Sequence, residues 1–176
     1  MSSFKDFNLD DETVVSDFKT KPLLVEMVPR TSWGDNLRSR LSKSDWDKLR
    51  KRQARFAGWR CEICGESGKD QGFNWPVEGH EIWSYDDKTH VQKLDGIISL
   101  CPLCHKVKHF GRTANVDGTD AVVAALKRLM RLNDWTLKQA EKHIKDAFDL
   151  WVERSTAPWS LNLTYLDEAG VSVLQA

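Results

Sequence analysis

Cys61-Glu62-Ile63-Cys64 and Cys101-Pro102-Leu103-Cys104 are two matched cysteine pairs, and they contain all four cysteines of this 176-residue chain. Paired Cys-x-x-Cys motifs are typical of zinc sites in reducing compartments. Four thiolates form a closed tetrahedral shell around zinc, without a position for a substrate, so such a site is structural. Two disulfides in a secreted domain and an iron-sulfur cluster are the alternatives to this structural Zn²⁺ site.

Three of the five histidines accompany the cysteine pairs. His80 lies in the 36 residues between Cys64 and Cys101, and the second pair runs directly into His105 and His109. Residues four apart on a helix lie on one face, so His105 and His109 have the spacing of metal ligands. With His80 they predict a second metal site that keeps positions open for water and a phosphate oxygen.

The segments Val77-Glu78-Gly79-His80-Glu81-Ile82 and Leu100-Cys101-Pro102-Leu103-Cys104-His105, with His109, resemble the HNH endonucleases of the ββα-metal, or His-Me finger, group. The resemblance covers about residues 59–112. It implies a metal-dependent enzyme that hydrolyses phosphodiester bonds in DNA. It also implies that His80, His105 and His109 surround a catalytic divalent ion (Mg²⁺, Mn²⁺, Zn²⁺ or Ni²⁺).

The chain departs from the family pattern at two places. Glu81 stands where the family typically has a second histidine as general base, and Asp95-Gly96 replaces the expected central asparagine. Glu81 can be the base, or it can bind the metal while His90 or Glu78 polarises the water. A surface carboxylate without a role is the third possibility. The alternative function is a catalytically inactive zinc-finger module of HNH fold that binds nucleic acid or a protein partner.

Charge distribution, rather than net charge, points to a nucleic-acid partner. Lys+Arg and Asp+Glu are equal at 26 each, but basic residues concentrate before Cys61 and after Cys104. Positive side chains that neutralise phosphates are the main source of affinity for DNA. The residues expected to contact DNA are Arg50, Lys51, Arg52, Arg55, Arg60, Lys106, Lys108 and Arg112.

The expected fold class is α+β: an HNH finger with a four-cysteine zinc, preceded by a basic helix and followed by a two-helix extension with a terminal strand. We expect an N-terminal arm at 1–30, the basic helix at 31–58, the finger at 59–112 and the extension at 113–176. Strands are expected at 23–28, 73–83, 97–100 and 161–165. Helices are expected at 45–58, with Trp46, Leu49 and Phe56 facing inward, and at 103–110, 121–132 and from Thr136 to Pro158.

The expected location is the cytoplasm, without a membrane partner. No stretch approaches the ~20 apolar residues of a membrane span, and the N-terminus lacks a basic head followed by an apolar run. Cutting both strands of DNA with one finger favours a homodimer, and the C-terminal helical unit can instead bind a larger assembly for which this chain supplies the nuclease.

Overall fold

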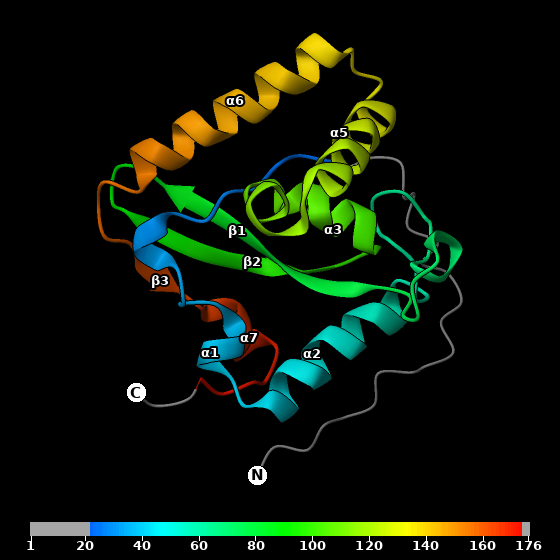
Figure 1. Cartoon of the computed structure of the whole chain (residues 1–176). Helices are drawn as coiled ribbons and strands as arrows, with labels where there is room; N and C mark the ends of the chain where they lie inside the picture. The colour runs from blue at the N-terminus through cyan, green and yellow to red at the C-terminus, as the bar shows by residue number, and fades with distance from the viewer. Residues whose placement is uncertain (1–21, 174–176) are drawn as a thin grey trace.

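The computed structural model describes residues 22–173, which adopt a mixed α+β fold (Figure 1). Its regular elements are α1 (Leu37–Arg40), α2 (Lys43–Phe56), β1 (Glu78–Asp86), β2 (Val91–Leu100), α3 (Pro102–Lys108), α4 (Phe110–Arg112), α5 (Thr119–Asn133), α6 (Leu137–Arg154), β3 (Ser160–Asn162) and α7 (Thr164–Glu168). The expected two strands followed by a helix are therefore present as β1, β2 and α3. β1 begins and ends five and three residues later than expected, whereas β2 begins six residues earlier than expected and ends at Leu100, as expected.

A three-stranded sheet with the order β1-β2-β3 forms the centre of the molecule. β1 pairs with β2 antiparallel, and β3 pairs with the beginning of β2 in parallel. Ile82 pairs with Gly96 and Trp83 pairs with Leu94, so Asp95 is the extra residue of a β-bulge. The bulge lies at Asp95-Gly96, and the β2 residues after it therefore point to the opposite faces from those that unbroken alternation would give.

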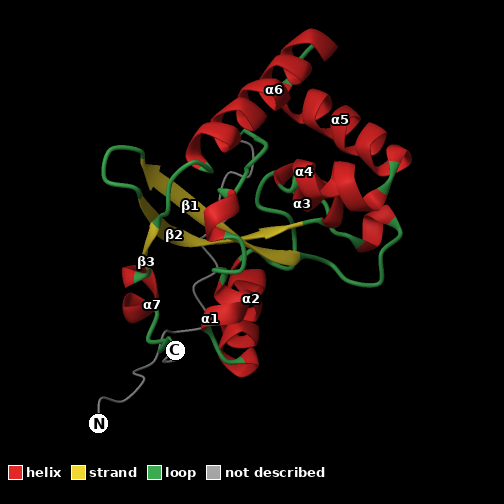
Figure 2. Ribbon diagram, turned by 60° about the vertical axis from the view of Figure 1, so that its left-hand side comes forward, coloured by secondary structure: helices red, strands yellow, loops and turns green. Residues whose placement is uncertain are grey.

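Helices cover both faces of the sheet, as the two views show: α3, α5 and α6 lie on one side, and α1, α2 and α7 on the other (Figures 1 and 2). Each side has its own apolar cluster. Ile98 and Leu100 pack with α3, α5 and three of the cysteines, whereas Leu94 and Ile97 pack with α1, α2 and α7. Because β2 supplies both clusters, it is buried along most of its length.

Helix α2 begins where the sequence provides a cap. The Ser42 side chain accepts a hydrogen bond from the Asp45 N–H at 3.1 Å, which satisfies one of the free donors of the first turn. Trp46 and Leu49 are buried as expected, but Phe56 is 66% exposed, so its predicted inward position is wrong. A Cβ at Gly79 would come within 2.9 Å of the Arg50 Cβ, so glycine is required for the close contact of α2 with β1.

The C-terminal part is helical, as expected, up to its last segment. A capping box of Thr136 and Gln139 starts α6, which ends at Arg154, before Pro158. The strand expected at 161–165 extends only over β3, and Thr164 begins α7, which buries Leu166 against the α2 side of the sheet. Alternating apolar residues thus predicted a strand where part of the segment is a short amphipathic helix.

The described part of the expected N-terminal arm packs into the core. Leu23 and Val25 belong to the cluster on the α3 side, and the Glu26 N–H donates to the Lys108 carbonyl at 3.0 Å. The strand expected at 23–28 does not form, and the rest of the arm, 1–21, lies outside the described residues. Within 22–173, no helix has the length and apolar character needed to cross a bilayer.

Candidate functional site

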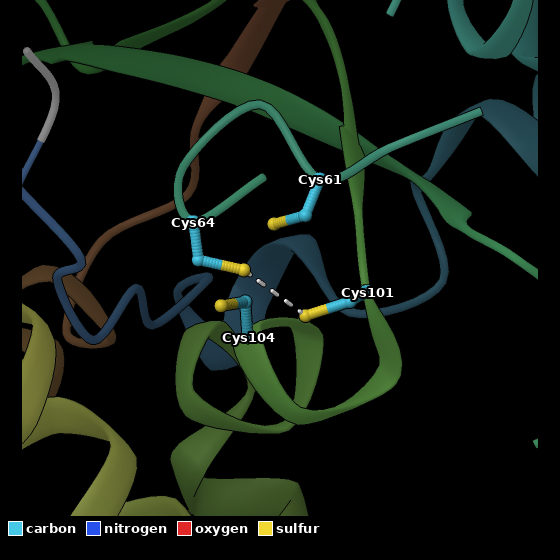
Figure 3. Close-up of side chains that lie close together, drawn as sticks. All are labelled: Cys61, Cys64, Cys101 and Cys104. Carbon is cyan, nitrogen blue, oxygen red and sulfur yellow. Dashed lines mark hydrogen bonds between the residues drawn. The ribbon is translucent and has the colours of Figure 1, made fainter. Parts of the chain in front are cut away.

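The four cysteines converge from three elements (Figure 3). Cys61 and Cys64 lie in a loop after α2, Cys101 follows β2, and Cys104 lies in α3. Their sulfur atoms all lie within 4.8 Å of one another, and Cys64 Sγ is 3.7 Å from Cys101 Sγ. A tetrahedron of sulfur ligands at ~2.3 Å from zinc has an edge of about 3.8 Å. The cluster can therefore hold a single structural ion such as zinc.

A tight turn after the first pair directs a backbone donor at the sulfur ligands. Gly65 has a φ of +75°, a conformation that glycine adopts without strain, and its N–H donates to the Cys61 carbonyl at 2.8 Å. The next N–H, from Glu66, donates to Cys64 Sγ at 3.4 Å. Hydrogen bonds within the cluster lower the pKa of Cys101, mainly through Cys104, and raise that of Cys104.

The three histidines named from the sequence also come together. His80 on β1, His105 on α3 and His109 at the end of α3 offer ring nitrogens that all lie within 4.8 Å of one another. His80 Nδ1 is 3.1 Å from His109 Nε2. That distance suits a hydrogen bond, and it is also near the edge of about 3.3 Å for nitrogen ligands at ~2.0–2.1 Å from zinc. Three protein ligands would leave a coordination position open.

Two carboxylates orient the rings of this cluster. Glu26 Oε2 is 2.9 Å from His80 Nε2, and Glu78 Oε2 contacts His105 Nδ1. An ionised carboxylate only accepts hydrogen bonds, so these ring nitrogens must donate. In the neutral tautomers the free lone pairs are then His80 Nδ1 and His105 Nε2, and His80 Nδ1 faces His109. Carboxylates in this position are common behind metal-binding histidines.

Burial and neighbouring charge set the protonation of the cluster. Burial raises the pKa of both Glu26 and Glu78, but hydrogen bonds with His80 and His105 bring each pKa below its ordinary value. Burial, followed by the charges of His80 and His105, lowers the pKa of His109 to about 3. At neutral pH the two carboxylates are ionised and His109 is neutral, which is the state that binds a cation.

Glu26 is a site residue that the sequence did not indicate. It lies 54 residues before His80 in a segment without a motif, and it contacts His80 and the ammonium of Lys108. Lys108 is only 7% exposed, so the structure does not place it where DNA could reach it. Lys108 lies among basic residues in the sequence, and that position did not predict its buried ion pair with Glu26.

The histidine cluster adjoins a hollow of about 630 Å³. His105 and His109 line it together with Glu78, Glu81 and Trp75, whereas His80 is buried at 4% exposure. Glu81 follows His80 on the strand, so the two side chains point to opposite faces. Glu81 Oε1 accepts from the Leu37 N–H at 3.3 Å, and the histidine cluster does not include Glu81. Among the described residues, Glu81 thus borders the hollow without joining the ring nitrogens.

The alternative water-polarising residues lie differently. Glu78 already accepts from His105 and from Trp75 Nε1, the latter at 2.9 Å. His90 is in the turn after β1, where its ring centroid is 5.3 Å from that of Trp159. At ~3.3 Å per residue along the strand, the six residues from His80 to Asp86 place this turn about 20 Å from the cluster. His90 is therefore outside the site.

The remaining basic residues divide between two surfaces. Lys51, Arg52, Arg55 and Arg60 are exposed on α2 and the following loop. Lys106 and Arg112 line the hollow, each paired with Asp117, and Arg38 joins them there. Arg50 is half-buried and paired with Asp47 at 2.7 Å. The hollow thus has three cations at its border, one of which, Arg38, was not among the residues expected to contact DNA.

Comparisons with protein-family models, curated proteins and solved structures found no match to this chain.

Proposed function

We propose that the chain is a metal-dependent endonuclease of the HNH type that hydrolyses phosphodiester bonds in DNA. The observation that supports this proposal most strongly is the convergence of the His80, His105 and His109 ring nitrogens beside an open hollow. Two of these rings have their tautomers set by carboxylates. Three imidazoles with one position open are the donor set of a catalytic site rather than a structural one.

The border of the hollow suits a phosphate group. A divalent ion held by the three histidines would stabilise negative charge on the phosphoryl oxygens and on the departing oxygen. Arg38 and Arg112 line the same hollow and can pair with the phosphates on either side of the scissile bond. Exposed Lys51, Arg52, Arg55 and Arg60 extend positive charge along α2, as an extended DNA backbone requires.

Glu81 is the proposed proton acceptor for the attacking water. It borders the hollow, and its Oε1 is oriented by the Leu37 N–H. A carboxylate is a weaker base than imidazole at neutral pH, so we expect slower turnover than an enzyme with histidine at this position.

The alternative, an inactive zinc-finger module that binds nucleic acid or a protein, is favoured by one observation. Glu81 lies outside the histidine cluster and accepts a hydrogen bond from the backbone of α1, as a purely structural carboxylate would. A module of this kind would use the basic surface of α2 without cutting the DNA that it binds.

The purified zinc-loaded chain is expected to convert supercoiled plasmid to nicked circles only when Mg²⁺, Mn²⁺, Ni²⁺ or additional Zn²⁺ is supplied. Nicking should weaken steeply with added salt, because released counterions contribute much of the affinity for DNA. Gel electrophoresis of plasmid, with single-stranded DNA and RNA assayed in parallel, measures the activity and the preferred substrate. Salt-sensitive binding without cleavage under any of these ions would favour the inactive module.

Glu26→Gln is expected to weaken divalent-ion binding at the histidines by about 10- to 100-fold, because outer carboxylates contribute that much to metal affinity. Glutamine keeps the size of the side chain but removes the charge that holds the His80 tautomer. Titration of nicking against Mn²⁺ concentration should show a higher midpoint, with activity recovered at high Mn²⁺. Glu141→Gln, an exposed carboxylate on α6, is the matched control. An unchanged midpoint in Glu26→Gln would contradict the role of Glu26.

A further inference from the structure

Arg128 on α5 is buried at 4% exposure, and its guanidinium faces the four-cysteine cluster. Nη2 donates to Cys64 Sγ at 2.7 Å and to Cys101 Sγ at 3.4 Å, and Nε donates to Cys104 Sγ at 3.4 Å. Nη1 is 2.8 and 3.0 Å from the two carboxylate oxygens of Glu66. The five N–H groups of the guanidinium therefore have five acceptors, three of which are sulfur atoms.

A buried guanidinium requires anionic partners. Arginine stays protonated in proteins, and a buried charge without compensation is strongly unfavourable. Neutral thiols are weak acceptors, whereas four thiolates around a divalent ion carry a net charge of −2. The surroundings of Arg128 thus suit a cluster of thiolates.

We infer that Arg128 is a positioning residue for the structural zinc: it touches the sulfur ligands rather than the ion, and it retains the metal by neutralising part of their charge. This inference rests on the assignment of zinc to the four cysteines and is independent of nuclease activity. Hydrogen bonds from Arg128 also withdraw charge from three sulfurs, so they lower the reactivity of these sulfurs toward electrophiles. When zinc is lost, Arg128 must therefore either move away from the sulfurs or keep its positive charge buried without an anionic partner.

The contact joins parts of the chain that the sequence separates. Arg128 lies 64 residues after Cys64, in the helical extension rather than in the 59–112 finger. Glu66 of the finger also pairs with Arg131 of the same helix at 2.9 Å. The finger and α5 should therefore hold zinc as one unit.

The test measures zinc release to an excess of a chromophoric chelator from the full-length chain. Arg128→Met keeps most of the side-chain volume and is expected to release zinc about 10- to 100-fold faster, the usual effect of losing a partner behind the metal ligands. Arg128→Lys should lie between Arg128→Met and the parent, because one ammonium cannot reach all three sulfurs. Arg131→Gln is the matched control. Arg131 also pairs with Glu66, but its side chain is 61% exposed and does not contact the sulfurs, so this variant should release zinc at the rate of the parent.

Two readouts separate this role from simple packing. In the Co²⁺-substituted protein, Arg128→Lys and Arg128→Met should shift the sulfur-to-cobalt charge-transfer band to lower energy, and alkylation of the metal-bound sulfurs by iodoacetamide should become faster. If Arg128→Met does not fold, Arg128→Lys decides the question. Release rates and spectra equal to the parent would overturn the inference. A parent protein without zinc would instead remove the zinc assignment itself.

Discussion

Replacing His109 with alanine is expected to lower plasmid nicking by more than about 100-fold while the protein keeps its fold and its zinc. Losing only an outer partner of a metal ligand costs about 10- to 100-fold, so loss of a ligand nitrogen should cost more. His109 Nε2 faces His80 Nδ1 at 3.1 Å, and its side chain also lines the hollow. Initial nicking rates at saturating Mn²⁺, with circular dichroism and zinc content measured on the same preparations, test this expectation.

His90→Asn is the matched control for the loss of a histidine. His90 has a φ of +52°, which asparagine adopts more readily than most residues, and it lies in the hairpin turn away from the cluster. Equal activities in His109→Ala and His90→Asn would show that the three histidines do not form the site.

Removing a general base costs about 10²- to 10⁴-fold, so Glu81→Gln should also lose most of its activity. Full activity in Glu81→Gln, with loss in His109→Ala, would exclude Glu81 as the base.

Removal of zinc from the four-cysteine cluster is expected to unfold the protein. The purified chain should contain one tightly held zinc, whose binding contributes roughly 10–16 kcal/mol in small zinc domains. A folded domain has a stability of only about 5–15 kcal/mol, so few domains tolerate such a loss. Cys61, Cys101 and Cys104 lie in the apolar cluster that also contains Leu100 and Leu129, which couples the metal to the core. Elemental analysis and thermal melts with and without a strong chelator measure the effect.

Reversibility provides the control for zinc removal. Adding back Zn²⁺ under reducing conditions should restore the melt, whereas Mg²⁺ should not, because thiolates bind magnesium poorly. A chain that retains its melting temperature after complete loss of zinc would show that the cysteine cluster is not a structural metal site. If the cysteines instead form disulfides, the melting temperature should fall with reductant and stay unchanged with the chelator.

Local sequence signals predicted much of the secondary structure. Thr136 caps a helix as expected, and apolar residues at helical spacing marked α5 and α6. Errors occurred where tertiary contacts override local pattern. Phe56 has helical spacing but is exposed at the last residue of α2, whereas the small side chains of Ala54 and Ala57 beside it are buried. β1 begins at Glu78 rather than at residue 73, because pairing with Leu100 sets its first residue.

The sequence predicted which residues gather in the two clusters, and short-range spacing explains the members that lie close together along the chain. A Cys-x-x-Cys turn brings two sulfurs together, and histidines four apart share one helix face wherever the helix lies. Glu26, Lys108 and Arg128 acquired their roles only in the folded chain. Their partners are 54, 82 and 64 residues away, and contacts at such separation leave no periodic signal in the sequence. Tertiary packing therefore decided which carboxylate orients His80, which lysine is buried, and which arginine contacts the cysteine sulfurs.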